Sequence, residues 1–317
     1  MFSILLVTFP FFALVLCGYV AARRAWLPQA AIPGLNSFVL YFALPCLLYR
    51  FGASTPIAQL LDASLVAVYL LCAVVMVAFT IAVTRSRRMN WNDAAFGALV
   101  AAFPNTGFMG VPLLVALLGV KAAGPAIVTM VVDLLVTSSL CIALSRLDSA
   151  DSHGAGVAAR KALQGVALNP MPWAIGLGAM SSGLQWTLPT PVMQTLGLLA
   201  DAASPVALFT IGAVLARSQM NSTTRTPLAD YVPVAIIKLV IHPTLLLLLG
   251  LSAIALGLPL DRFALTVVVL VAALPSASNG ALLSERFGAD SGRIARIILL
   301  STVLAFFSFS AAVALLV

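Results

Sequence analysis

The chain has 317 residues, of which 62% are hydrophobic and only 9% are charged, and its mean hydropathy is +1.10. Because soluble domains carry about 25% charged residues, this composition excludes a water-soluble globule and places the chain in a lipid bilayer. The formal net charge of +7 is common to membrane proteins and nucleic-acid-binding proteins, so the placement of the basic residues decides between them.

Ten apolar runs follow one another, each long enough for the roughly 20 residues that a helix needs to cross a bilayer. They start near Ser3, Gly34, Leu60, Ala94, Ala122, Pro170, Pro191, Ala229, Arg262 and Ser291. The sequence therefore predicts an all-α integral membrane protein with ten transmembrane helices. A polar linker, 148–168, separates a first five-helix repeat, 1–147, from a second, 169–317. An odd number of helices per repeat inverts the second copy.

The first apolar run is predicted to be a retained helix. A cleavable signal peptide needs basic residues ahead of its apolar run, whereas Arg23 and Arg24 follow it. We therefore expect this helix to insert with its N-terminus outside the cell.

The 17 basic residues are placed one-sidedly. The even-numbered loops hold only Arg50, Lys121 and Arg262, and Lys238 lies inside a span, so all the others fall in the odd-numbered loops. The positive-inside rule then places the odd loops in the cytoplasm and both termini on the extracytoplasmic side. This pattern is that of a multi-pass membrane protein and gives nucleic acid binding no support.

The residues that would carry enzyme or metal chemistry are missing from the sequence. Its cysteines lie within apolar spans and are interpreted as packing residues: Cys17, Cys46, Cys72 and Cys141. A membrane-embedded enzyme would need paired acids, an H-E-x-x-H motif, or a Ser or Cys with its base. We therefore predict no catalytic residue, metal, disulfide or cofactor.

Four prolines at matching places in the two repeats predict helix breaks: Pro45 and Pro104 in spans two and four, and Pro205 and Pro275 in spans seven and nine. A proline removes a backbone hydrogen bond and clashes with the preceding turn. In a membrane such positions sit in protein interior or line a cavity. Pro104 and Pro275 each lie in a polar cluster near the middle of a span, which is typical of a transporter substrate site.

The order and spacing of several motifs resemble the auxin efflux carrier family over almost the whole chain. They are Ala43-Leu44-Pro45, Phe103 to Pro112, Asn169-Pro170, Ser204 to Gly212, Lys238 to Pro243, Leu274-Pro275 and Asn279-Gly280. The resemblance implies ten spans as two inverted repeats, with helices four and nine unwound and crossing at the midplane between a scaffold and a transport domain. It also implies a homodimer and, because no long central loop is present, a bacterial malonate- or malate-type carrier.

The predicted crossing suits an anion on chemical grounds alone. A half-helix that restarts after Pro104, around Gly107, presents unpaired N–H groups and the positive end of its dipole. Polar side chains from both broken helices can add donors, so that a carboxylate needs no buried counter-charge. The candidates are Asn105, Thr106, Ser276, Ser278 and Asn279. The alternative is that these groups only repair the backbone that the prolines break.

Titratable residues inside the spans are further candidates, because a charge at the centre of a span costs about 2.5–3.5 kcal/mol. Lys238 can attract the substrate anion, pair with an aspartate, or snorkel toward the cytoplasm. Asp133 and Asp201 are candidates for coupling, with a structural role as the alternative. His242 is a candidate proton carrier or a structural hydrogen-bonding residue.

These observations predict a secondary active transporter of a small organic anion, working by alternating access. Uptake of a dianion against the membrane potential needs a coupled cation, for which we favour the proton over sodium. A channel-like facilitator or a solute sensor on the same fold is the alternative, and an enzyme is a more distant one.

Overall fold

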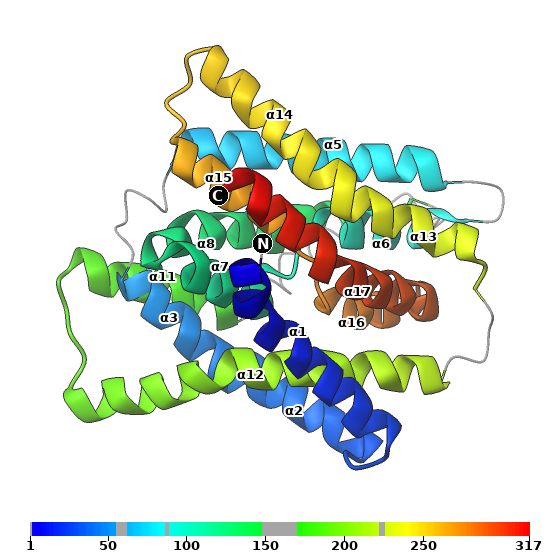
Figure 1. Ribbon diagram of the computed structural model, residues 1–317, viewed down its shortest axis with the longest axis horizontal. Helices are drawn as coiled ribbons and strands as arrows, with labels where there is room; N and C mark the ends of the chain where they lie inside the picture. Colours follow the sequence, from blue (N-terminus) through cyan, green and yellow to red (C-terminus); the bar gives the residue numbers. More distant parts are fainter. Residues whose placement is uncertain (1, 55–61, 86–88, 148–169, 222–225) are drawn as a thin grey trace.

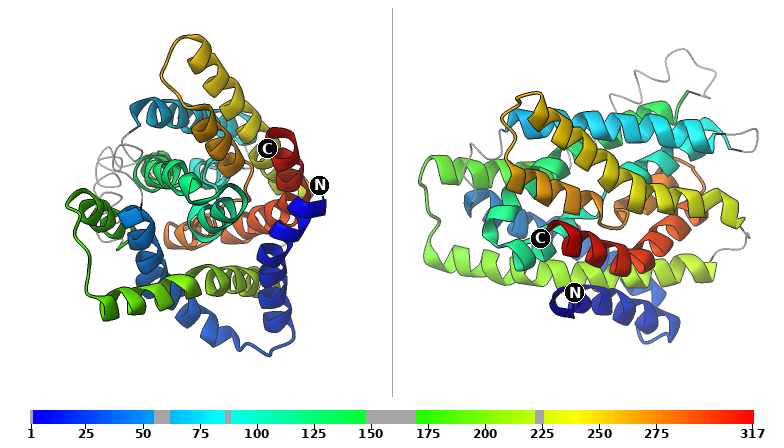
Figure 2. Two further views of the ribbon diagram at one scale, coloured as in Figure 1. Left: turned by 60° about the vertical axis from the view of Figure 1, so that its left-hand side comes forward. Right: turned by 45° about the horizontal axis from the view of Figure 1, so that its top comes forward.

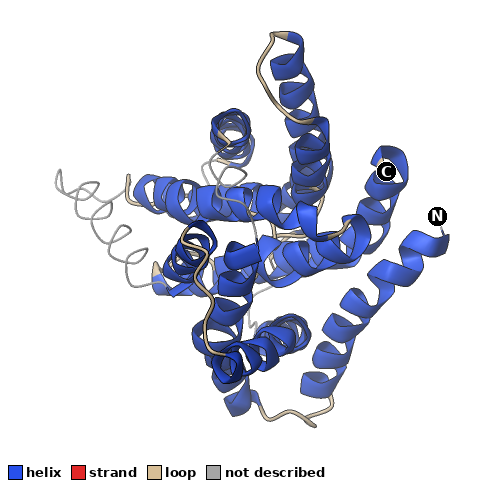
Figure 3. Ribbon diagram, turned by 90° about the vertical axis from the view of Figure 1, so that its left-hand side faces the viewer, coloured by secondary structure: helices blue, strands red, loops and turns tan. Residues whose placement is uncertain are grey.

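A computed structural model describes residues 2–54, 62–85, 89–147, 170–221 and 226–317. The predicted linker, 148–168, lies outside these described residues. Throughout the described ranges the regular structure is helical (Figure 3). Their one antiparallel bridge joins Pro104 to Ser276. The predicted all-α class therefore agrees with the structure.

One group of helices, which we call the first module, packs along one side of the molecule (Figure 1). It consists of α1 (Phe2–Arg23), the 3-10 helix η1 (Gln29–Ala31), α2 (Ile32–Phe38), the π-helix η2 (Val39–Ala43), α3 (Leu44–Ser54), α11 (Pro170–Gly183) and α12 (Thr190–Asn221).

Reciprocal glycines let these helices approach closely. Gly18 of α1 faces the Phe209 carbonyl and Gly212 of α12 faces the Val15 carbonyl, so a side chain at either glycine would clash with backbone. Gly178 of α11 meets α3 in the same way. Small residues of this kind are how helices associate in lipid, where burial of apolar surface gives no net gain.

The remaining helices form the second module, whose helix α17 packs against α1 and α12 of the first module; Figure 2 gives two further views of the arrangement. Its first half comprises α5 (Ala63–Thr84), α6 (Trp91–Ala102), η3 (Thr106–Gly110), α7 (Val111–Leu118), η4 (Val120–Ala122), α8 (Ala123–Val132), η5 (Asp133–Thr137) and α9 (Ser138–Leu144). Its second half comprises α13 (Leu228–Ile236), η6 (Ile237–Ile241), α14 (His242–Ala255), α15 (Arg262–Ala272), α16 (Asn279–Arg286) and α17 (Ser291–Leu316).

Seven helical stretches of the described chain are long and apolar enough to cross a membrane. The three other predicted spans are shorter: Pro170–Gly183 has 14 residues, and the fourth and ninth are each divided at a proline. Arg262–Ala272, with 11 residues, reaches about half of a 30 Å hydrocarbon core. The chain is therefore a multi-pass membrane protein, while the count of ten and the inverted repeat stay predictions.

Two of the four predicted helix breaks are wrong. Helix α12 runs without interruption through Pro205, and Pro45 is the second residue of α3. Before Pro45 the chain widens into the π-helix η2, in which Leu44 donates its N–H to the carbonyl of Val39, five residues back. The wider turn accommodates the proline without ending the helix. The same π-turn precedes Pro112 and Pro243.

One end of the molecule, which we call the basic end, lies at the right of Figure 1. It holds the ends of α1, α5 and α12 and the starts of α6, α13 and α17. Here the buried Arg293 guanidinium donates from Nε to the Asp230 carbonyl at 2.7 Å and from Nη1 to the Asp93 carbonyl at 2.9 Å. Arg293 thereby fixes the starts of α6, α13 and α17 together.

Candidate functional site

The two broken helices cross inside the second module. The Asn105 N–H donates to the Pro275 carbonyl at 2.9 Å, and the Ala277 N–H donates to the Phe103 carbonyl at 2.9 Å. These reciprocal bonds form a short antiparallel bridge between the extended segments at Pro104 and Ser276. In a medium without water, backbone groups freed from a helix must find partners within the protein, and here each broken segment supplies partners for the other.

Side chains from neighbouring helices satisfy backbone groups that the bridge leaves over. Pro275 has no N–H, and the Ser276 N–H donates to the Ser301 Oγ of α17 at 3.2 Å instead of to the preceding helical turn. The Ala272 carbonyl, left at the end of α15, accepts from Lys238 Nζ at 2.7 Å. Lys238 therefore holds the end of the half-helix that leads into the crossing.

The half-helices that leave the crossing begin with free backbone donors. Within the described residues, the N–H groups of Gly107 and Phe108 at the start of η3 donate to no oxygen, and neither do those of Ser278 and Asn279 at the start of α16. Unpaired N–H groups and the positive end of a helix dipole favour negative charge. The crossing thus presents unpaired backbone donors from both broken helices, an arrangement that suits a negatively charged group.

The predicted polar side chains lie at this crossing. Within the described part of the chain, the buried Asn105 amide makes no hydrogen bond and does not cap η3, and the buried Ser276 Oγ has no partner. Ser278 and Asn279 are half-buried. The hydroxyl of Thr106 reaches the Pro104 carbonyl only at 3.5 Å. Repair of the backbone therefore occupies neither the Asn105 nor the Ser276 side chain.

A small pocket separates the crossing from the first module. Phe108 and Ser278 line it on one side, and Asn36 of α2 and Thr210 of α12 line it on the other. Its volume of about 10 Å³ is room for roughly one water molecule. The two modules are thus closed against each other where their polar groups meet.

Two glycines allow the broken helices to pack closely at the crossing. A Cβ added at Gly110 would come within 2.6 Å of Leu274 Cδ1, and one added at Gly280 would clash with Val100 Cγ1. Each contact joins one broken helix to the other. Because the branched Val100 side chain is short, it cannot move away as the tip of Leu274 can.

Gly280→Ala should therefore lower the melting temperature of the purified protein, because overpacking a buried site costs about 1–3 kcal/mol. The matched control is Gly176→Ala on α11, where an added Cβ would meet nothing within 4 Å. Thermal unfolding of both variants in detergent tests this expectation. Equal melting temperatures for the two variants would contradict the close packing of the crossing.

A buried cluster of titratable side chains lies beside the crossing. The Asp133 carboxylate accepts from the Tyr69 hydroxyl at 2.8 Å and from the Thr137 hydroxyl at 2.9 Å. Lys238 Nζ is 3.0 Å from His242 Nδ1, and the rings of His242 and Tyr69 are 6.4 Å apart. Tyr69 and His242 thus lie between the Asp133 carboxylate and the Lys238 ammonium group. The cluster therefore joins α5, η5, η6 and the end of α15.

Full burial of Lys238 rules out the expectation that it snorkels to the surface. Asp201 does not belong to the cluster. It is exposed on α12 and forms an ion pair with Arg50 at 2.7 Å. The sequence marked Asp201 because it lies within an apolar run, but α12 has 32 residues, more than the roughly 20 that cross a bilayer. A coupling role for Asp201 therefore has no geometric support.

Sequence reasoning missed several residues of the site. Tyr69 and Ser301 lie in apolar helices, where a single hydroxyl gives little signal. Asn36 and Thr210, opposite the crossing, carry no charge and adjoin no break. A signal did exist for Tyr69. The other residues of α5 are almost all apolar, and a tyrosine hydroxyl buried in such surroundings needs a hydrogen-bond partner.

The architecture is that of a multi-pass membrane protein, and the family whose model the chain matches is one of membrane transporters. The chain belongs to the family described as "Membrane transport protein", whose model matches residues 3–154 and 156–313. The motifs quoted above identify this family as that of the auxin efflux carriers.

Named relatives are similar over most of their length. A "Putative malonate transporter" of Rhizobium meliloti (strain 1021) is 29% identical over 93% of this chain and 90% of the relative. The "Uncharacterized transporter YfdV" of Escherichia coli (strain K12) is 26% identical over 88% and 86%. An "Uncharacterized transporter" of Methanothermobacter thermautotrophicus is 28% identical over 93% and 92%.

Proposed function

We propose that this protein is a secondary active transporter that carries a small organic anion across the cytoplasmic membrane by alternating access. The observation that supports this most is the crossing, where N–H groups and an asparagine amide that have no partner among the described residues lie inside a membrane protein. Broken helices place such groups near the midplane in many secondary transporters.

The substrate class that fits these donors is a carboxylate. Asn105, Ser278 and Asn279 offer neutral side-chain donors beside the free N–H groups, and neutral donors bind an anion without making its release too costly. Malonate or another small dicarboxylate is the first substrate to test, because one relative bears the name of a malonate transporter.

Alternating access requires the two modules to separate. A pocket of about 10 Å³ between them is too small for a dicarboxylate, given that such a volume holds roughly one water molecule. Substrate entry then means that the crossing moves away from α2 and α12, first on one face of the membrane and then on the other. Asn36 and Thr210 supply the polar surface against which the crossing closes.

The cluster beside the crossing supports proton coupling. A dianion entering a cell works against about 2.3 kcal/mol per charge per 100 mV, so accumulation needs a cation. With one proton between them, Asp133 and Lys238 have a combined charge of zero, whichever of the two carries it. A second proton makes Asp133 neutral and Lys238 positive, so the cluster becomes positively charged. Lys238 also holds the Ala272 carbonyl, which links protonation of the cluster to the crossing. Sodium is the competing coupling ion.

Asp133→Asn should abolish uptake driven by a proton gradient while leaving exchange of substrate across the membrane. Asparagine keeps the hydrogen bond to Tyr69 but cannot take up the coupling proton. The measurement is uptake of labelled malonate into liposomes with an inward proton gradient, for wild type and the variant. Asp201→Asn is the matched control, because Asp201 is exposed and paired with Arg50, and it should transport like the wild type.

Proton-driven uptake that survives Asp133→Asn would contradict this role. Uptake that follows a sodium gradient alone would assign the coupling to sodium. Counterflow separates a carrier from a channel-like facilitator, because only a carrier exchanges one bound substrate for another, and a sensor shows no flux at all.

The basic end is proposed to face the cytoplasm, since Arg23, Arg24, Arg293 and Arg296 gather there and positive charge is retained inside. Both termini would then lie on the extracytoplasmic side.

A further inference from the structure

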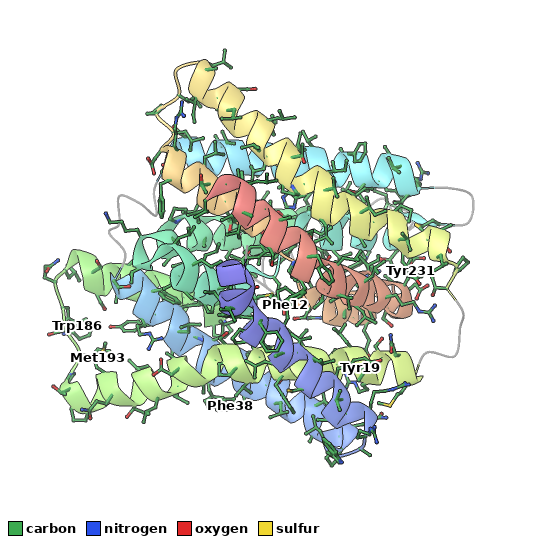
Figure 4. All side chains as sticks on the ribbon, in the orientation of Figure 1. Phe12, Tyr19, Phe38, Trp186, Met193 and Tyr231 are labelled. Carbon is green, nitrogen blue, oxygen red and sulfur yellow. The ribbon has the colours of Figure 1, made fainter. Side chains whose placement is uncertain are left out.

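A second cavity opens at the basic end, between the two modules. Its volume is about 470 Å³. Residues of α1 and α12 line one side, and residues of α13 and α17 line the other. Figure 4 shows Tyr19 of α1 and Tyr231 of α13 toward this end of the molecule. The cavity is distinct from the pocket at the crossing, with which it shares no lining residue.

One part of the cavity carries hydrogen-bond donors. Arg23, at the end of α1, and Arg296, on α17, both line it. Within the described residues the Arg23 guanidinium and the Tyr231 hydroxyl have no partner, and Gln219 accepts from Tyr19 with its carbonyl oxygen, which leaves its amide free to donate. Arg296 reaches the Thr226 carbonyl at 3.1 Å. None of the described lining residues is acidic.

The other part is an apolar wall that continues onto the membrane-facing surface. Leu299, Leu300 and Val303 of α17 form it, and 57% of Val303 is exposed. Helix α17 is one of those able to span the membrane, so this wall runs from the basic end toward the hydrocarbon core. The cavity is therefore cationic at its outer end and apolar where it meets lipid.

We propose that this cavity binds an anionic phospholipid, with the phosphate between Arg23 and Arg296 and one acyl chain along α17. Arginine is well suited to phosphate because its planar fork makes paired, charge-assisted hydrogen bonds. A soluble anion would use the arginines but leave the apolar wall exposed. Because the two arginines belong to different modules, the bound headgroup connects α1 to α17 and stabilises the closed arrangement of the modules.

Thermal unfolding in detergent tests this site without measuring transport. Phosphatidylglycerol should raise the melting temperature of the wild type, whereas phosphatidylcholine and glycerol 3-phosphate should not. Arg23→Gln should raise the phosphatidylglycerol concentration that gives half of the maximal stabilisation about fivefold, as expected for the loss of one basic group at an anionic lipid. Arg24→Gln, at the neighbouring residue of the same helix end, removes the same charge outside the cavity and should leave the effect unchanged.

Arg23→Gln is the decisive variant, because the Arg23 guanidinium makes no hydrogen bond or ion pair with a described residue, so its loss should not affect folding without lipid. Arg296→Gln also loses the hydrogen bond to the Thr226 carbonyl. The shift in melting temperature that lipid causes in this variant is therefore measured from the variant's own melting temperature without lipid. An equal loss in Arg24→Gln would mean attraction by surface charge only and would overturn the proposal. Stabilisation by glycerol 3-phosphate, or none by phosphatidylglycerol, would overturn it as well.

Discussion

Lys238→Met should abolish transport and lower the thermal stability of the protein. Lys238 is fully buried, donates to the Ala272 carbonyl at 2.7 Å and lies 3.0 Å from His242 Nδ1. Methionine fills the space but leaves that carbonyl without a donor and Asp133 without its neighbouring positive charge. Leaving a buried hydrogen-bonding group without its partner costs about 1–3 kcal/mol, and removing the positive charge from the cluster that holds Asp133 adds to this cost. Thermal unfolding and proton-driven malonate uptake measure the two effects.

A second substitution separates the electrostatic cause from a packing defect. Adding Asp133→Asn to Lys238→Met removes the charge left uncompensated, so the double variant should unfold at a higher temperature than Lys238→Met alone. Such non-additivity is expected for residues that interact. Transport should stay lost. Lys121→Met, at an exposed lysine, is the matched control and should behave like the wild type. A double variant less stable than Lys238→Met would contradict the charge coupling.

Asn105→Ala and Asn279→Ala should each weaken substrate binding about ten- to a hundredfold. Each removes a donor to a carboxylate, and hydrogen bonds to charged groups contribute about 1.5–3 kcal/mol, where 1.4 kcal/mol is tenfold. Binding of labelled malonate to purified protein measures the loss. Asn105→Ala should leave the melting temperature nearly unchanged, because its amide has no partner within the described residues.

The isosteric variant Asn105→Asp provides the matched comparison for this site. It keeps the shape of the side chain but replaces a donor by a negative charge that repels a carboxylate, so it should bind malonate no better than Asn105→Ala. Binding retained in Asn105→Asp would mean that Asn105 does not face the anion, and the site would then lie elsewhere in the crossing.

The sequence predicted the crossing because two kinds of signal coincide there. Pro104 and Pro275 each lie in a polar cluster, and the structure ends helices α6 and α15 just before them. Pro45 has apolar neighbours and Pro205 follows a single serine, Ser204, and the helix continues through both prolines. A proline alone therefore does not predict a break, because a π-turn or neighbouring groups can accommodate it.

Charged residues in apolar runs differ in how deeply the structure buries them. Asp133 and Lys238 lie well inside their helices and are fully buried. Asp201 lies in a helix longer than a bilayer requires, so the run did not fix its depth, and it is exposed. The partners of these charges, Tyr69 and the Ala272 carbonyl, depend on tertiary contacts that no local pattern records.

Counterflow of labelled malonate into liposomes preloaded with unlabelled malonate tests the central claim most directly, that the protein is an anion carrier with its site at the helix crossing. We expect transient accumulation in the wild type and its loss in Asn105→Ala. Well-folded wild-type protein that shows no counterflow with malonate or with other small dicarboxylates, or an Asn105→Ala variant that accumulates malonate like the wild type, would contradict it.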